Sequence, residues 1–515
     1  MRTVSGSPSP LGRMAPHIVG PPLPAPASLW AAHGRRALSA GACVTAPLVL
    51  FLLLHRPDLG TAAALAGFTA VYGHALPYRR RAVVSAAVGL VLVAAVALGG
   101  LAGPHPFLLA LVLGVLGAAA TAATAIWHIG PPGPLMAVLV GGSASTLGTD
   151  ASLLAGHVAA ATGGAALSWL VVMAAWLWDP DGPERRAVAA ADAALSAAED
   201  GGVQAARPDP VARAVRVAHV AVSYGSRRRP SLRARLDGIE MRFMRALPAL
   251  DTAPAEPEIP TAATTARWRV PLWMPTAARI GLGVWAAGTL AAALGLHSPY
   301  WAATTAVAVL LGTDARHTRA RALHRVTGTL LGSAVTALLF WLALPVGVTV
   351  VLIGVMLVGV ELLVASQYVL AVSLITPLAL SLVHLSAPST PGTELLGIRL
   401  GETVVGIAVG LAAGLLLFPR TGSRRLPTAV RTTVQRALAA TGGPDDRALR
   451  DALAAQHEVA TAARAELFAA PGADVLLRRS RQVADLGWAL LGARARGESE
   501  LAATVAERIR TDFAG

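Results

Sequence analysis

The chain has 515 residues, of which 54% are hydrophobic and only 14% are charged, and its mean hydropathy is +0.58. Soluble domains usually carry about 25% charged residues, so the composition indicates that lipid is the main solvent. The net charge of +14 comes entirely from arginine, because the sequence contains no lysine. This excess fits either nucleic-acid binding or a membrane protein with cytoplasmic arginines. The single cysteine, Cys43, excludes an internal disulfide and a cysteine-rich metal site.

The first 34 residues form a predicted disordered N-terminal tail. Proline, serine and glycine dominate residues 1–27, and such a composition cannot bury enough apolar surface to fold. The tail also lacks the apolar core of a signal peptide.

Twelve apolar segments follow, each near the length of about 20 residues that a helix needs to cross a bilayer. The predicted first membrane repeat (35–178) contains spans at 37–54, 59–77, 82–102, 106–127, 132–148 and 152–178. The predicted second repeat (277–419) contains spans at 277–295, 299–313, 326–344, 346–363, 367–386 and 400–418. The fold class is therefore all-α, with about twelve transmembrane helices.

The arginines give the orientation of these spans. If the N-terminus is cytoplasmic, the outside loops hold only Arg56 and Arg399. The inside loops and flanks then hold Arg35, Arg36, Arg79, Arg80, Arg81, Arg316, Arg319, Arg321, Arg325, Arg420, Arg424 and Arg425. This asymmetry is the positive-inside pattern, so it predicts cytoplasmic N- and C-termini and argues against nucleic acid as a partner.

Two segments are not membrane-like. Residues 179–276 and 420–515 carry arginine, aspartate and glutamate among apolar residues at helical spacing, which predicts amphipathic cytoplasmic helices. A linker rich in proline, alanine and threonine is predicted at 248–266. Each membrane repeat is thus followed by a cytoplasmic helical segment.

The two halves repeat each other weakly. HRPDLGTAAALAGFTAVYGHALPYRRRAVVSAAVGL in the first half parallels HSPYWAATTAVAVLLGTDARHTRARALHRVTGTLLG in the second. Each stretch has a His-x-Pro loop, a short span of small residues, an arginine-rich loop and a new span. Because both repeats start inside and contain six spans, they are parallel, which is one known transporter plan.

The second half resembles the fusaric acid resistance family of integral membrane transporters, which includes aromatic acid exporters and has plant malate channels as distant relatives. The resemblance rests on SPYWAATTAVAVLLGTDARHTRARALHRVTGTLLGSAVTALL, SQYVLAVSLITPLALSL and RLGETVVGIAVGLAAGLLLFP. It singles out Tyr300, Trp301, Arg321, Arg325, Arg399, Glu402 and Thr403 as substrate-binding or coupling candidates. It gives a structural role to Gly328, Thr329, Gly332, Tyr368, Pro377 and Gly406. The resemblance implies export of small, often aromatic, acids.

Several of these residues admit two interpretations. Arg399 and Glu402 share one helix face, either as a mutual ion pair or as an anion-attracting arginine beside a proton-accepting glutamate. Tyr300 and Trp301 fit an aromatic belt or a stacking surface for substrate. Another charged residue, Glu361, is expected to be a solvated glutamate at a helix end.

The arginines at 316–325 are chiefly a topology signal, and they could also attract acidic substrates to a cytoplasmic mouth. Gly328 and Gly332 suit close helix packing. Neither a P-loop nor a hydrolase, dinucleotide or zinc motif occurs, so we predict no enzyme activity, cofactor or metal.

We therefore predict an exporter of small organic acids, of the aromatic carboxylic class, driven by protons and located in the cytoplasmic membrane. The expected partners are the lipid bilayer, the acid substrate, further copies of the chain and an envelope protein. A passive anion channel and a non-transporting assembly protein remain alternatives. Gradient-driven uptake of an acid separates them.

Overall fold

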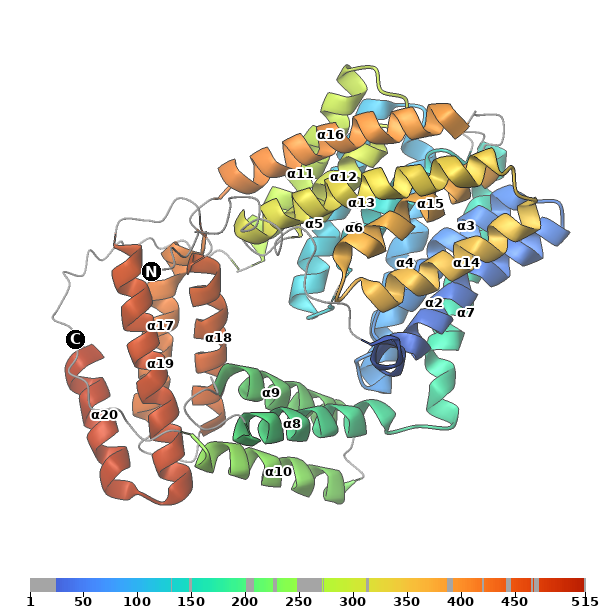
Figure 1. Ribbon diagram of the computed structural model, residues 1–515. Coiled ribbons are helices and arrows are strands. Elements are labelled where there is room, and N and C mark those ends of the chain that lie inside the picture. The colour runs from blue at the N-terminus through green and yellow to red at the C-terminus, as the bar shows by residue number, and fades with distance from the viewer. Residues whose placement is uncertain are drawn as a thin grey trace, which may run out of the picture. The chain divides into compact units, whose positions relative to one another are not determined.

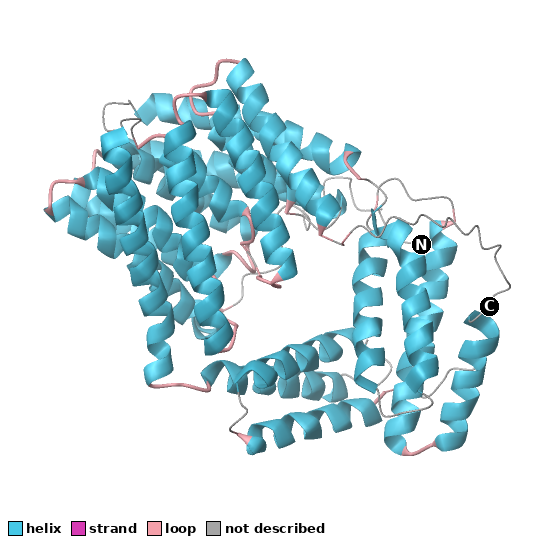
Figure 2. Ribbon diagram, turned by 180° about the vertical axis from the view of Figure 1, so that it is seen from behind, coloured by secondary structure: helices cyan, strands magenta, loops and turns pink. Residues whose placement is uncertain are grey.

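A computed structural model of the chain describes residues 25–513, with gaps at 131, 148–150, 201–207, 226–228, 248–270, 272, 312–314, 387–391, 419–420, 441–445, 465 and 467–471. The described residues contain helices and no strand (Figure 2). They divide into two compact units. The first comprises residues up to His74, Arg81–Ala175 and Val270–Leu417; the second comprises Ala75–Arg80, Trp176–Arg269 and the chain from Phe418 onward.

The first unit contains six helical elements from each half of the chain (Figure 1). The first half supplies α2 (Pro26–Leu53), α3 (Pro57–Gly67) with the 3-10 helix η1 (Phe68–Val71), α4 (Tyr78–Ala102), α5 (Pro106–Ile126), α6 (Leu135–Ala144) and α7 (Ala151–Ala174), after which comes η2 (Ala175–Leu177). The second half supplies α11 (Met274–Ala293), α12 (Tyr300–Leu310), α13 (Ala315–Trp341), α14 (Val346–Leu363), α15 (Tyr368–Ser386) and α16 (Gly392–Leu416).

Eight of the described helices are long and apolar enough to cross a membrane, namely α2, α4, α5, α7, α13, α14, α15 and α16. Large apolar side chains on these helices point outward, including Leu90, Val115, Val355 and Val404, each at least 60% exposed. An apolar surface of this extent is not stable in water. The protein is therefore a multi-pass membrane protein, as predicted.

The predicted tail and the predicted spans need two corrections. Residues 1–24 lie outside the described part of the chain, but α2 starts at Pro26, inside the segment predicted to be disordered. Proline is favourable in the first turn of a helix, and residues 28–32 (SLWAA) continue the helix that Pro26 begins. In addition, α3, α6 and α12 have only 11, 10 and 11 residues, which is too short for a full crossing.

The two halves make equivalent contacts. Gly41 of α2 crosses α14 at Gly354 and Val358, and Gly281 of α11 crosses α5 at Gly114 and Ala118. Residue numbers in these two crossings differ by 240 throughout. Thus the first helix of each half packs against the fourth helix of the other half.

The direction of this crossing bears on the repeat topology. Moving along α2 from Gly41 to Thr45, the facing position on α14 moves back from Val358 to Gly354, so the two helices run antiparallel. In chains whose helices reverse direction at each turn, parallel halves have antiparallel first and fourth helices, as observed. In inverted halves, the first helix of one half and the fourth helix of the other would run parallel. The contacts therefore support two parallel six-element repeats.

The second helix of each half is short and enclosed. Every residue of α12 is buried, as are Gly60–Gly67 in α3. Each packs against the last helix of its own half, α12 on α16 and α3 on α7. Gly406 of α16 and Gly164 of α7 make these contacts close, because a Cβ atom there would meet the Ala302 or Ala63 carbonyl group.

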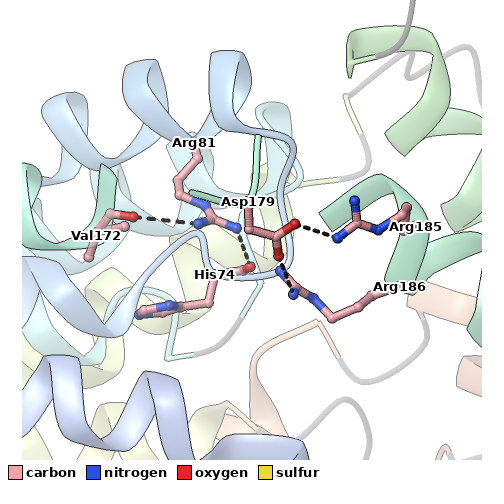
Figure 3. Close-up of polar contacts among 6 residues, drawn as sticks. All are labelled: His74, Arg81, Val172, Asp179, Arg185 and Arg186. Atoms are coloured by element: carbon pink, nitrogen blue, oxygen red, sulfur yellow. Dashed lines mark hydrogen bonds and ion pairs between the residues drawn. The ribbon is translucent and has the colours of Figure 1, made fainter. Parts of the chain in front are cut away.

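The second unit draws on both ends of the chain. It contains α8 (Gly182–Asp200), α9 (Pro208–Gly225), α10 (Pro230–Arg245), α17 (Thr421–Ala440), α18 (Asp446–Arg464), α19 (Ala473–Arg496) and α20 (Ser499–Phe513) (Figure 1). Before α8, Asp179 pairs with Arg185 at 2.5 Å and Arg186 at 3.3 Å (Figure 3). The two helical segments that we predicted separately share one apolar core, in which Phe243 meets Trp488 edge-on at 5.9 Å. The predicted linker at 248–266 lies outside the described residues.

Candidate functional site

The clearest candidate site lies at the start of α12, inside the first unit. Tyr300 and Trp301 follow the His-x-Pro loop, and both are buried, with 1% and 3% of their surfaces exposed. Their ring centroids are 4.7 Å apart. Burial this complete does not fit an aromatic belt at a lipid surface, so the two rings are part of the interior.

Arg399 of α16 is placed over this aromatic pair. Its guanidinium carbon lies 4.1 Å from the centroid of the Trp301 ring, a cation–π contact. The side chain has no exposed surface, and none of its three guanidinium nitrogens has a hydrogen-bond partner among the described residues. A buried guanidinium group without an anion is costly, so this position is suited to an anionic ligand.

Glu402 shares the buried face of α16 but does not pair directly with Arg399. Its Oε1 accepts a hydrogen bond from the Ser298 backbone N–H at 2.7 Å, and its Oε2 has no hydrogen-bond partner among the described residues. The two side chains interact electrostatically without an ion pair within 4.0 Å. The mutual ion pair, one of the two sequence interpretations, is therefore not what the structure shows.

A second buried arginine lies near the first. Arg325 is 3% exposed, and its Nε has no hydrogen-bond partner among the described residues. It interacts electrostatically with Arg399, although the sequence places the two at opposite ends of the membrane. The reason is that α13 starts at Ala315, so Arg325 lies well inside the helix and not at its flank.

The other candidates have packing contacts. The Thr403 hydroxyl donates to the Arg399 carbonyl at 2.7 Å and stays within its own helix. Gly328 and Gly332 face α15, where an added Cβ atom would come within 2.6 Å of Val372 and 2.7 Å of Thr376. Thr329, between them, is 1% exposed, and its hydroxyl group has no hydrogen-bond partner in the part of the chain that the structure describes.

Two predicted residues, Tyr368 and Pro377, are not part of this cluster. Tyr368 opens α15 and its ring lies 6.3 Å from that of His324. Pro377 lies within α15. The backbone of Arg321 lies in α13, but its side chain is outside the described residues, as are those of Arg316 and Arg319.

Two arginines of the first half were classed by sequence only as topology signals. Arg36 of α2 pairs at 2.5 Å with Glu361 of α14, and Glu361 is 4% exposed, so the expectation of a solvated glutamate is wrong. Arg81 is also buried and donates to the carbonyl groups of His74 and Val172 (Figure 3) and to that of Gly73. Both side chains are stabilised inside the protein by these contacts, Arg36 by a carboxylate and Arg81 by backbone carbonyl oxygens.

Taken together, the second half presents two buried guanidinium groups, one carboxylate and two stacked aromatic rings. The local charge is positive, and the aromatic surface lies directly beneath one cation. An organic anion with a planar apolar body could pair its carboxylate with Arg399 and pack its body near Trp301.

Comparison with known proteins agrees with this location. Residues 285–413 match the family described as fusaric acid resistance protein-like. Over 477 residues the chain is 24% identical to an uncharacterized membrane protein, YvaC, of Bacillus subtilis (strain 168), covering 78% of this chain and 75% of the relative. No solved structure matches. The matched segment contains α12 to α15, most of α16 and the C-terminal part of α11, and therefore every residue of the candidate site.

Proposed function

We propose that this membrane protein, whose second half is a fusaric acid resistance protein-like domain, exports small organic acids, aromatic carboxylic acids above all, and is driven by the proton gradient. The observation that carries the proposal is Arg399, fully buried, without a hydrogen-bond partner among the described residues, and stacked on Trp301. An ionisable side chain within a membrane domain usually marks a substrate or ion pathway.

The position of the site in the fold supports transport. Short helices at corresponding places in two repeats are a sequence pointer to a transporter binding site, and α3 and α12 are such a pair. The site lies at the N-terminal end of α12, where the helix dipole favours negative charge. Both features favour a bound anion near the centre of the membrane unit.

Glu402 supplies a candidate for coupling. Its free Oε2 lies in the same buried site as Arg399, so a proton on this carboxyl group would change the local charge that a substrate experiences. We propose that Glu402 gains a proton as the acid leaves Arg399. We further propose that the protein lies in the cytoplasmic membrane with both termini in the cytoplasm, and that it moves the acid out of the cytoplasm. The arginine asymmetry of the loops supports this orientation.

The test uses the purified full chain in liposomes, with benzoate as the probe and an imposed pH gradient. With an acidic lumen, a proton-coupled exchanger accumulates benzoate inside, opposite to the diffusion of neutral benzoic acid in protein-free liposomes, whereas a passive channel only dissipates the benzoate gradient. A protein that serves assembly does neither. Arg399→Gln should abolish transport and weaken benzoate binding by about 100-fold or more, as expected for losing a buried charge-assisted hydrogen-bond partner.

Glu402→Gln separates coupling from binding. Removing a negative charge beside Arg399 should preserve benzoate binding and facilitated exchange but abolish uphill accumulation. Gradient-driven accumulation by Glu402→Gln at the wild-type level would show that this carboxylate is not the coupling group. Val404→Ala, on the exposed face of the same helix, is the matched control and should transport normally.

A further inference from the structure

The first half contains a close pair of titratable residues, buried His157 and partly exposed Asp58, at the place that corresponds to the anion site. The loop residues His55 and Pro57 correspond to His297 and Pro299, so residue n of the first half matches residue n + 242 of the second. The same offset relates Gly164 to Gly406 and the last residue of α7, Ala174, to that of α16, Leu416. It therefore holds for the second and last helices of each half.

Applied to the site, this correspondence matches Asp58 with Tyr300 and His157 with Arg399. Although the residue types differ, the structure brings the pair together. His157 is 1% exposed, and its Nε2 lies 3.4 Å from Asp58 Oδ2, without the geometry of a hydrogen bond. Asp58 in turn accepts two hydrogen bonds from Arg56, at 3.1 and 2.9 Å. Gly156, beside His157, packs towards Leu59, the counterpart of Trp301.

The surroundings of His157 contain few other charges. The helices that pack on α7 are α2, α3 with η1, and α4. Residues 44–54, 59–71 and 82–102 of these elements include no titratable side chain. The titratable residues that border these ranges are Cys43, exposed His55 and Arg56, Asp58, Tyr72, Arg81 and exposed His105. The α15 helix, which contacts α3, adds His384, whose ring packs against Phe340 at 5.1 Å. Of the histidines in this region, His157 is the one that lies within 4.0 Å of Asp58 in the described part of the chain.

We propose that His157 and Asp58 form a proton-binding site in the first half, and that proton binding there is coupled to anion binding at Arg399 in the second half. Histidine is the side chain that ordinarily changes charge between about pH 5 and 8. The imidazolium form places a positive charge in this buried site and can pair with the Asp58 carboxylate, whereas the neutral form carries no such charge. One half thus binds the proton and the other the anion.

The route for coupling is the packing between halves. The α3 helix, which carries Asp58, contacts α15 of the second half, and α12, which carries Trp301, contacts α6 of the first. At the latter contact an added Cβ atom on Gly142 would meet the Tyr300 ring at 2.6 Å. Each short helix is therefore braced by the opposite half. The coupling part of the inference rests on the proposed anion site, whereas the proton site does not.

The proton site can be tested without any ligand. The full chain, labelled with [13C]histidine in nanodiscs, should show one histidine resonance that is absent from His157→Gln. Histidine ordinarily changes charge between about pH 5 and 8, so over this range the resonance should respond reversibly to pH, and the response should change in Asp58→Asn. A resonance that does not respond to pH, or a response that is unchanged in Asp58→Asn, would overturn the proton site.

Coupling is tested by benzoate binding in the Glu402→Gln background, where the anion site has no carboxylate of its own to titrate. Benzoate affinity should still change about threefold or more across this pH range and should become independent of pH when His157→Gln is added, by reciprocal linkage. Exposed His105 provides the control, since His105→Gln should keep the dependence. Its persistence in His157→Gln would overturn the coupling. Failure of the wild type to bind benzoate at any pH would instead overturn the proposed anion site, and the histidine resonance would still decide the proton site.

Discussion

The two halves of the membrane unit share a scaffold but treat charge in opposite ways. In the second half, Arg399 is buried on Trp301 without an ion pair or hydrogen bond among the described residues. In the first half, the equivalent position holds His157, whose neighbour Asp58 is already paired with Arg56. The site in the second half thus contains a buried cation without an ion pair among the described residues, whereas the carboxylate at the equivalent place in the first half has an arginine partner.

This difference separates the part of the fold that is architecture from the part that is site. Glycine crossings and short second helices occur in both halves, so they are needed to build the repeat. The buried, unpartnered cation occurs at one of the two equivalent places only, so the architecture does not require it. A costly feature that packing does not explain is best explained by a ligand.

The largest expected effect concerns the shared architecture. Gly164→Ala and Gly406→Ala should each lower the free energy of unfolding by about 3 kcal/mol, because the new methyl group would meet a helix backbone that cannot yield. Neighbouring Gly163 and Gly401 have open space at Cβ, so Gly163→Ala and Gly401→Ala should be neutral. Unfolding of the full chain in mixed detergent and SDS measures all four. A large loss in one half only would mean that the halves are not equivalent in packing.

A smaller effect is expected where the halves differ in their first helices. Arg36→Met should cost about 2 kcal/mol, because it leaves the Glu361 carboxylate buried without its partner. The double variant Arg36→Met/Glu361→Leu should recover most of that loss in the same unfolding assay. If the double variant is as unstable as the single one, the ion pair does not account for the stability of this contact between halves.

The sequence predicted much of this architecture. Hydropathy and arginine placement located the helical elements of both halves, because long apolar runs and loop charge reflect the bilayer directly. Family motifs also singled out Trp301, Arg399 and Glu402, which the structure brings to one buried cluster. Such residues stand out because a charge or a tryptophan in an apolar run is rare.

What the sequence missed depends on contacts distant along the chain. Glu361 appeared to end a helix in water, but its partner Arg36 is more than 300 residues away. His157 belongs to no sequence motif, and its relation to Asp58 becomes visible only when α3 and α7 are packed together. A local pattern cannot show which helix face meets which partner.

Replacing an arginine by methionine at the anion site should change the free energy of unfolding in the opposite direction to Arg36→Met. Arg399→Met should raise the free energy of unfolding of the ligand-free protein by about 1–2 kcal/mol, because it removes a buried charge that lacks an ion pair or hydrogen bond in the described structure. The contrast with Arg36→Met is the useful comparison, since both remove one arginine from a membrane helix. Destabilisation by Arg399→Met would indicate that the chain itself satisfies this guanidinium group, and the argument for a ligand would fail.

The smallest expected effect lies in the second unit. There, helices that follow the first half form ion pairs with a helix that follows the second half. Glu240 of α10 contacts His219 of α9 and Arg450 of α18. Burial alone would raise the pKa of Glu240, but the hydrogen bond to His219 and the charge of Arg450 outweigh it and lower the pKa below its ordinary 4.5. The stabilisation is therefore complete above about pH 4.5 and is lost as the pH falls through the folded-state pKa.

Glu240→Gln should accordingly cost about 1 kcal/mol at neutral pH, and its difference from the wild type should shrink under acid. Urea unfolding of the full chain, followed by hydrogen exchange in α10 peptides, measures this difference between about pH 4 and 7. Burial raises the pKa of Asp485 in the same unit, which gives the wild-type profile a contribution of opposite sign. Only the difference between wild type and variant therefore isolates Glu240, and a difference that is constant with pH would show that this carboxylate does not join the two segments through its charge.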